Sequence, residues 1–160
     1  MTMETTNDLF HHELKDIYFA VHELTTVYDR MANETVDDDI RVFFEGHLSE
    51  TSTHIERLFD VFNATGRPPE TVRCQGIEGL LEEWTEFTDK APAGPLHDYY
   101  NLTTAIKTER YELSAYRSLI NIASRQDHSE AADLLQANLD ENEQALDELI
   151  KMAQEFESLP

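Results

Sequence analysis

Apolar residues recur at steps of three and four through most of the chain, which is the spacing of an amphipathic helix. The pattern predicts long helices over about residues 8–33, 36–65, 97–125 and 127–157, each with one apolar stripe. Helices of roughly 25–30 residues are about 40 Å long, since each residue adds about 1.5 Å. Long helices of matched length that each bury one face form a bundle.

The ends of these helices carry recognisable signals. Asn7 is in position to cap the first helix, and Gly66, followed by "RPP", is a strong stop for the second. At the start of the last helix, Asp127 is expected to cap and Glu130 to complete a capping box. Only a few residues separate the first helix from the second and the third from the fourth. Each of these pairs is therefore expected to form an antiparallel hairpin.

The second and third long helices are joined by about 30 residues, enough to cross the length of the bundle. This segment contains a short amphipathic helix near residues 75–88, with the apolar residues Ile77, Leu80, Leu81 and Trp84. Two hairpins joined by a long crossover are the arrangement of ferritin-like bundles. The sequence therefore predicts an all-α, ferritin-like antiparallel four-helix bundle in a single domain, residues 1–160.

Acidic residues dominate the charge of the chain, with 33 acidic against 12 basic residues and a net charge of −21. Such a surface repels nucleic acids and anionic membranes, so neither is an expected partner. It also repels itself at low salt, whereas the Debye length falls to about 3 Å at about 1 M salt, so we predict a halophilic host. The alternative is a surface that binds a cationic partner, although the acidic residues are spread over every segment.

The chain has one cysteine, Cys74, and therefore no internal disulfide. Its N-terminal segment lacks the features of a signal peptide, and no segment approaches the roughly 18 apolar residues of a membrane span. We therefore expect a soluble, cytoplasmic protein. Cys74 is expected to be a small, at least partly buried residue rather than a nucleophile.

Polar side chains interrupt the apolar stripes of two helices. His47, Glu50 and His54 follow one face of the second helix, and Glu109 and Glu112 lie on the third. Spacings of three and four residues place ligands on one face, and carboxylates with imidazoles bind iron, manganese or zinc. The alternative is that these groups end in water or in ion pairs. The candidate partners of Glu109 and Glu112 would then be Arg110, Arg117, His47 and His54.

The remaining polar and aromatic residues favour structure over chemistry. The sequence has no glycine-rich phosphate loop, no nucleophile elbow and no C-x-x-C motif. The tyrosines of the third helix are expected to pack in the fold with solvated hydroxyls: Tyr99, Tyr100, Tyr111 and Tyr116. The other histidines are expected at the surface or at helix caps: His11, His12, His22, His97 and His128.

Five runs of residues resemble the YciE/YciF family of stress-associated, ferritin-like proteins: "LFHHELKDIYFAVHEL", "FFEGHLSETSTHIERLFDVF", "CQGIEGLLEE", "TERYELSAY" and "LLQANLDENEQALDEL". The likeness extends over about residues 9–155. It implies a rubrerythrin-like antiparallel bundle, often a dimer, with a di-metal site. Of the family pattern, this chain keeps His47, Glu50, Glu109 and Glu112, and it has His54 at a position that is usually polar.

Three positions depart from the family pattern at this site. The inward carboxylate of the first helix is replaced by Val21, and those of the last helix by Asn142 and Leu146, all on stripes predicted to be buried. A di-iron centre needs about four carboxylates to neutralise its two dications, whereas here ligands remain on only two helices. We therefore expect either no metal or one weakly bound ion of iron, manganese or zinc.

These observations favour a non-catalytic bundle protein with a degenerate di-metal site. The resemblance implies a stress-associated role and a homo-oligomer, such as a dimer. One alternative is a metal-binding oxidoreductase or iron-handling protein that uses the ligands of the second and third helices. Another is an acidic module that binds a protein partner, which an exposed Trp84 would favour and a buried Trp84 would not.

Overall fold

The computed structural model describes residues 2–160, which fold into five α-helices with no β-strand in this range. The helices are α1 (Thr6–Glu34), α2 (Asp38–Ala64), α3 (Gln75–Thr88), α4 (Pro95–Arg125) and α5 (Ser129–Gln154). Each predicted helix begins and ends within three residues of the observed bounds. The all-α prediction is therefore confirmed.

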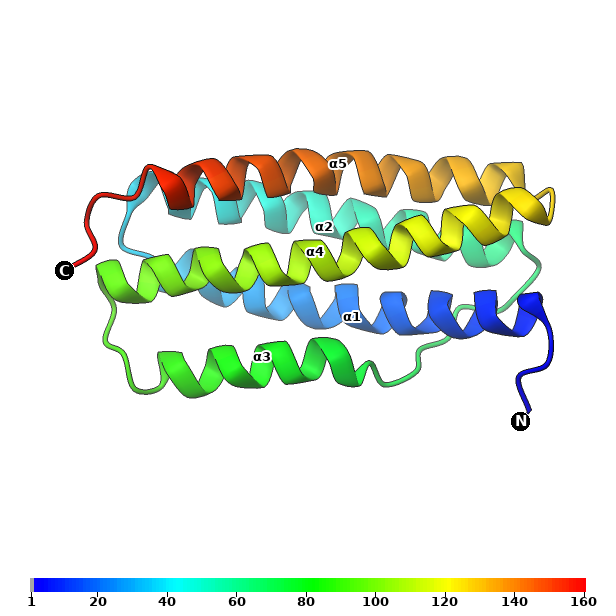
Figure 1. The fold of residues 1–160 in the computed structure, drawn as a ribbon, viewed down its shortest axis with the longest axis horizontal. Helices are drawn as coiled ribbons and strands as arrows, with labels where there is room; N and C mark the ends of the chain where they lie inside the picture. Colours follow the sequence, from blue (N-terminus) through cyan, green and yellow to red (C-terminus); the bar gives the residue numbers. More distant parts are fainter. Residues whose placement is uncertain (1) are drawn as a thin grey trace.

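The four long helices lie side by side as two antiparallel hairpins, α1 with α2 and α4 with α5 (Figure 1). The hairpins pack on each other through contacts of α2 with α5 and of α1 with α4. Between α2 and α4 the chain crosses the length of the bundle, and α3 lies within this crossover against α4 and α1 (Figure 1). This is the ferritin-like arrangement that the sequence predicts.

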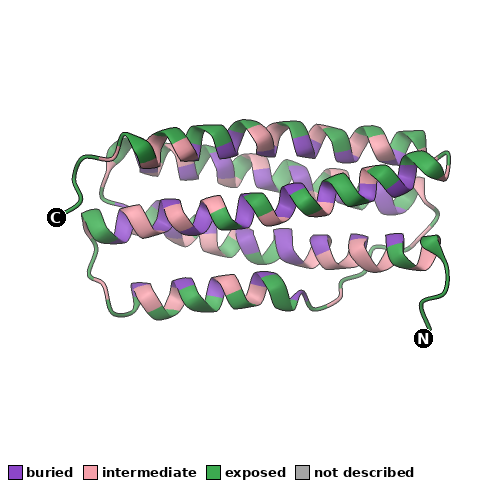
Figure 2. Ribbon diagram, viewed as in Figure 1, coloured by how far each residue is buried: buried purple, intermediate pink, exposed green. Residues whose placement is uncertain are grey.

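One apolar core runs along the bundle, where the buried faces of the long helices meet (Figure 2). The predicted stripes of α1 and α2 are buried along their whole length, polar residues included. Trp84 of α3 is only 1% exposed, and its Nε1 donates to Asn101 Oδ1 at 2.8 Å. This burial removes the feature that would favour an interaction module. Within residues 2–160, no helix combines the length and the apolarity that crossing a membrane would require.

Two helix starts differ from the predictions. Thr5 rather than Asn7 is the N-cap of α1, since the Thr5 hydroxyl accepts from Asp8 N at 3.1 Å and the Asp8 carboxylate accepts from Thr5 N at 3.0 Å. These two bonds form a capping box, and the cap lies two residues before the predicted one. The capping box predicted at α5 is wrong, because Asp127 has a left-handed φ of 59° whereas an N-cap needs an extended backbone. His128 takes the N-cap position without a side-chain hydrogen bond.

The predicted stop after α2 is confirmed at Gly66. This residue has a φ of 69°, in the region that favours glycine. Its N–H donates to Asn63 O at 3.1 Å, and the next N–H, of Arg67, donates to Phe62 O at 3.0 Å. These two bonds form a Schellman motif, which satisfies carbonyl groups that the end of the helix leaves free.

A buried polar network holds the turn between α1 and α2 against α4. Asp98 is 1% exposed, and its carboxylate accepts from the backbone N–H groups of Val36 at 3.1 Å and Asp37 at 2.9 Å. His97 is 3% exposed, and its Nε2 lies 3.4 Å from Glu34 Oε2. The surface or capping role predicted for His97 is wrong, because the first turn of α4 packs over the α1–α2 turn.

Cys74 and Tyr111 join the start of α3 to the bundle. The buried Cys74 Sγ lies 3.0 Å from Tyr111 Oη, which donates to Asp16 Oδ2 at 2.9 Å. Burial raises the pKa of the Cys74 thiol, which agrees with a structural residue rather than a nucleophile. Of the other histidines, one is exposed as predicted, His22, and three are half-buried: His11, His12 and His128.

Candidate metal centre

His47 and Glu109 form a buried ion pair between α2 and α4. His47 Nε2 lies 2.6 Å from Glu109 Oε1, and the two side chains are 1% and 0% exposed. His47 Nδ1 lies 3.2 Å from Glu50 Oε2, and Tyr28 Oη donates to Glu109 Oε1 at 3.1 Å. Both ring nitrogens therefore face carboxylates, and neither is free to bind a metal while the pair is intact. His47 is thus the partner of Glu109 that the ion-pair alternative requires.

The charges in this part of the core compensate each other. Burial by itself lowers the pKa of His47, but the charge of Glu109 and hydrogen bonds to Glu109 and Glu50 outweigh it and raise the pKa to about 10. Glu112 is buried one turn further along α4, and burial together with the Glu109 charge raises its pKa well above the usual range. His47 therefore supplies a positive charge next to Glu109, so this carboxylate has a partner in the core that is not a metal ion.

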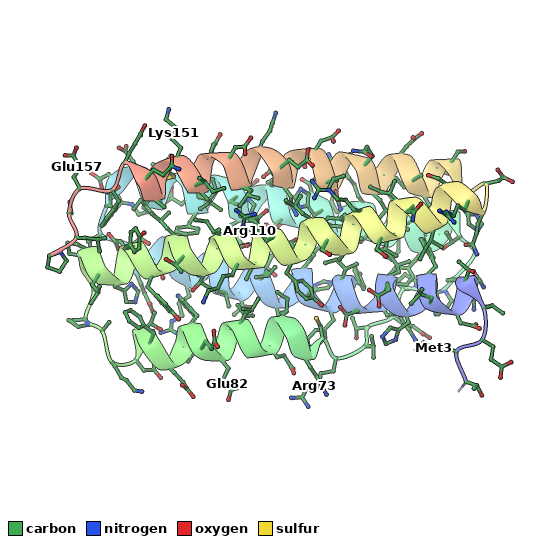
Figure 3. The ribbon with its side chains drawn as sticks, viewed as in Figure 1. Met3, Arg73, Glu82, Arg110, Lys151 and Glu157 are labelled. Carbon is green, nitrogen blue, oxygen red and sulfur yellow. The ribbon has the colours of Figure 1, made fainter. Side chains whose placement is uncertain are left out.

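The arginines of α4 do not pair with the core carboxylates, so this part of the ion-pair expectation is wrong. Arg110 follows Glu109 in the sequence, but successive residues on a helix point about 100° apart. Its side chain is accordingly exposed at the surface of α4 (Figure 3). Arg117 is also exposed and pairs with Glu143 of α5 at 2.6 Å.

A second group of ligands lies at the edge of the core, between α2 and α5. Glu50, His54 and Glu141 each offer a donor atom within 4.8 Å of the others, and no other three His, Cys, Asp or Glu side chains of residues 2–160 converge in this way. We call these three residues the rim site. His54 Nε2 lies 2.8 Å from Glu141 Oε2, and the two side chains are 1% and 30% exposed. Burial lowers the pKa of His54, so its ring is neutral at pH 7, the form that binds metals.

Arg57 contacts the outer carboxylate of the rim site. Its Nη1 donates to Glu141 Oε2 at 2.7 Å, and its Nη2 donates to Oε1 at 2.9 Å. Nη1 also donates to Asn138 Oδ1 at 3.1 Å. The hydrogen bonds from Arg57 hold the pKa of Glu141 below its usual range. Glu141 is therefore a charged carboxylate with a cation already beside it.

A cavity of about 310 Å³ opens beside the rim site. It is lined by Phe43, Gly46 and Glu50 of α2 and by Glu141, Gln144 and Glu148 of α5. A side chain added at Gly46 would meet no atom within 4 Å, so the wall is open at this point. A water molecule takes about 30 Å³ in the liquid, so the cavity has room for the water ligands of a cation.

Comparison with known proteins identifies the family. Residues 5–158 match the family described as "Domain of unknown function (DUF892)". The chain belongs to the DUF892 family. It is 32% identical over 142 residues to Protein YciF of Escherichia coli (strain K12), and the match covers 88% of this chain and 86% of YciF.

Two solved structures show the same bundle as this DUF892 protein. The crystal structure of the E. coli stress protein YciF matches with a TM-score of 0.90 at 30% identity, over 95% of this chain and 96% of YciF. YcfI from Rhodopseudomonas palustris matches with a TM-score of 0.88 at 32% identity, over 92% of this chain and 94% of that one. The resemblance to the YciE/YciF family is thus confirmed.

The side chains of this DUF892 protein do not fit the di-metal centre that the resemblance implies. Val21 and Asn142 are fully buried and Leu146 is 8% exposed, so the three departures from the family pattern lie in the core. The two core carboxylates that remain are Glu109, which pairs with His47, and Glu112, whose raised pKa favours the neutral acid. Two dications need about four carboxylates.

Four of the five ligands predicted from the sequence belong to the ion pair or to the rim site. His47 and Glu109 form the ion pair, His54 belongs to the rim site, and Glu50 contacts both groups. Glu112 is buried on α4 outside the rim site.

Glu141 and Arg57 are not among the residues predicted from the sequence to form the site. Glu141 directly precedes the stripe position Asn142, so a search for ligands at stripe positions passes over it. A search one residue to either side of each stripe would include it. It would also include many of the 33 acidic residues of the chain.

Proposed function

We propose that this protein is a non-catalytic, ferritin-like member of the DUF892 family that binds one divalent cation weakly at the rim site. The observation that carries the proposal is the convergence of donor atoms from Glu50, His54 and Glu141 within 4.8 Å. Two carboxylates and one imidazole suit Zn²⁺, Mn²⁺ or Fe²⁺. Water from the neighbouring cavity would supply the other ligands.

The ion pair in the core supports the non-catalytic part of the proposal. A metal that bound Glu109 would have to displace His47, and breaking a buried pair costs about 3–5 kcal/mol. Val21, Asn142 and Leu146 offer no carboxylate that would repay this cost. The core of the bundle is therefore better suited to stability than to holding two metal ions.

The relationship to YciF supports inferences about the physiological role, the location and the assembly of this protein. Because the E. coli relative is described as a stress protein, we infer a stress-associated function for this chain as well. We also infer a cytoplasmic homo-oligomer, which the resemblance to the YciE/YciF family supports. The buried Trp84 gives no support to a separate protein-interaction module.

Metal analysis tests the rim site directly. Protein is dialysed to equilibrium against a fixed concentration of Zn²⁺ in about 1 M KCl, which screens the unspecific attraction of cations to the acidic surface, and bound metal is measured as the excess over the outer solution. We expect one equivalent of Zn²⁺ per chain, lost in Glu141→Gln and retained in Asp147→Asn. Asp147 is an exposed carboxylate on the same helix, so the control loses the same charge. Equal retention of Zn²⁺ in both variants would contradict the proposal.

The alternative, a metal-binding oxidoreductase or iron-handling protein, is favoured by the retention of Glu109 and Glu112 on α4. It predicts a different stoichiometry. Two equivalents of Fe²⁺ per chain, both lost in Glu109→Gln, would replace the proposed function with this alternative. One equivalent that survives Glu109→Gln would agree with the rim site.

A further inference from the structure

We propose that Arg57 and a divalent cation compete for Glu141, so that the rim site exchanges a guanidinium group for a metal ion. This inference rests on the proposed function, because it concerns the regulation of the same site. Arg57 donates one hydrogen bond to each oxygen of the Glu141 carboxylate, at 2.7 and 2.9 Å. A paired contact of this kind is among the stronger hydrogen-bonded interactions of a carboxylate.

The geometry places the two cations at the same atom. Glu141 Oε2 accepts from Arg57 Nη1 at 2.7 Å and lies 2.8 Å from His54 Nε2. A metal bound to both Glu141 and His54 would therefore take up the space next to Oε2. The guanidinium of Arg57 and a metal ion bound to the same carboxylate oxygen would repel each other strongly. Arg57 therefore has to leave when the metal binds.

The charges of the rim site favour the exchange once metal is present. Glu50 and Glu141 carry two negative charges, and Arg57 brings only one positive charge to them. A divalent cation would neutralise both carboxylates. The Arg57 side chain is 24% exposed, so its charged end can move into water without being buried elsewhere.

Asn138 gives Arg57 a defined position when no metal is bound. Its Oδ1 accepts from Arg57 Nη1 at 3.1 Å. Its Nδ2 is oriented by the backbone oxygen of His54 at 3.3 Å and the hydroxyl of Tyr116 at 3.4 Å. The guanidinium is therefore held in place on two sides, and Glu141 stays paired in the absence of metal.

The dissociation constant for Zn²⁺, measured by competition with a chromophoric chelator in about 1 M KCl, tests the exchange. In Arg57→Gln, which removes the competing charge, we expect Zn²⁺ to bind at least about tenfold more tightly than in the wild type. The control is Arg41→Gln, since Arg41 lies on the same helix and pairs with Asp38 away from the rim site. Its affinity for Zn²⁺ should equal that of the wild type.

Arg57→Lys provides a second variant, because it keeps the positive charge and loses the paired contact. It should bind Zn²⁺ more weakly than Arg57→Gln, and an affinity equal to that of Arg57→Gln would overturn competition between charges. Equal affinity in the wild type and Arg57→Gln would overturn the exchange and leave the rim site standing. If Zn²⁺ binding in both were no greater than in Glu141→Gln, the rim site itself would be overturned and the exchange with it.

Discussion

Replacing Glu109 by glutamine removes the negative charge of the buried pair with His47 and keeps the size of the side chain. Removing one partner of a buried pair destabilises a protein by about 3–5 kcal/mol. The pKa of His47 rises from 6.5 to about 10 in the folded protein. Since one pKa unit corresponds to about 1.4 kcal/mol, the pair contributes at most about 5 kcal/mol. We therefore expect Glu109→Gln to lower the free energy of unfolding by about 3–5 kcal/mol near pH 6.5.

The pH dependence distinguishes this effect from a loss of packing. Because the folded pKa of His47 is raised, its stabilisation is complete below pH 6.5 and is lost as the pH rises towards about 10. In this window the folded protein holds a proton that the unfolded chain has released. The free energy of unfolding therefore falls by about 1.4 kcal/mol per pH unit through this group. Without the charge of Glu109, burial lowers the pKa of His47, and this slope disappears above neutral pH.

Urea unfolding near pH 6.5, 8 and 9.5 measures both effects in the wild type and in Glu109→Gln. Glu56→Gln is the control, since Glu56 is an exposed carboxylate on α2. The difference in free energy between the wild type and Glu109→Gln should shrink by about 1.4 kcal/mol per pH unit. The control should differ from the wild type by less than about 0.5 kcal/mol at each pH. A Glu109→Gln deficit that is the same at every pH would refute a charged His47 in the folded protein.

Four further predictions address the rest of the molecule. Asp98→Ala should lower the free energy of unfolding by about 2–4 kcal/mol in urea, because two backbone N–H groups lose their acceptor, and Asp98→Asn should lower it less. Gly76→Ala should destabilise by about 1–3 kcal/mol, since its Cβ would lie 2.9 Å from the Tyr111 ring, whereas Gly79→Ala, with open space around it, should stabilise. The melting temperature should rise with KCl up to molar concentrations, and a flat series would contradict the halophilic interpretation. Restoring the family's carboxylates should allow two equivalents of Mn²⁺ to bind per chain in metal analysis, in the triple variant Val21→Glu, Asn142→Glu, Leu146→Asp.

The bundle can be predicted from the sequence because the apolar stripes and the helix-end signals depend only on residues that are near one another in the chain. The apolar stripes of the long helices are buried, and the stop at Gly66 follows from a backbone conformation that glycine prefers. The choice between Thr5 and Asn7 as N-cap is different, because either side chain can cap and the path of the preceding chain decides which one does. The burial of His97 and Asp98 depends on a contact with the distant α1–α2 turn, which no local pattern encodes.

The candidate site can be predicted only in part. The residues on the stripes of α2 and α4 identify His47 and Glu109, but a metal site and an ion pair use the same side chains. In the structure both nitrogens of His47 face carboxylates, which is the arrangement of the ion pair. Arg57 and Glu141 are 84 residues apart in the chain, and each has many alternative partners in a sequence with 33 acidic residues. Their contact needs the register of α2 against α5, which periodicity leaves undetermined.

The position of Glu141 on α5 also explains why its carboxylate lies at the edge of the core instead of inside it. Neighbouring residues on a helix point about 100° apart, so a carboxylate at position 141 and one at position 142 face different surroundings. Asn142 is fully buried, and among residues 2–160 neither of its side-chain polar atoms has a hydrogen-bond partner. A carboxylate there would join Glu109 and Glu112 in a low-dielectric core and would depend on metal for compensation. At the edge, water and Arg57 compensate Glu141 when no metal is bound, and His47 compensates Glu109. The loss of carboxylates from the core and the position of Glu141 at its edge therefore agree with the proposed function, in which a cation at the rim site would bind and leave without removing charge compensation from the core.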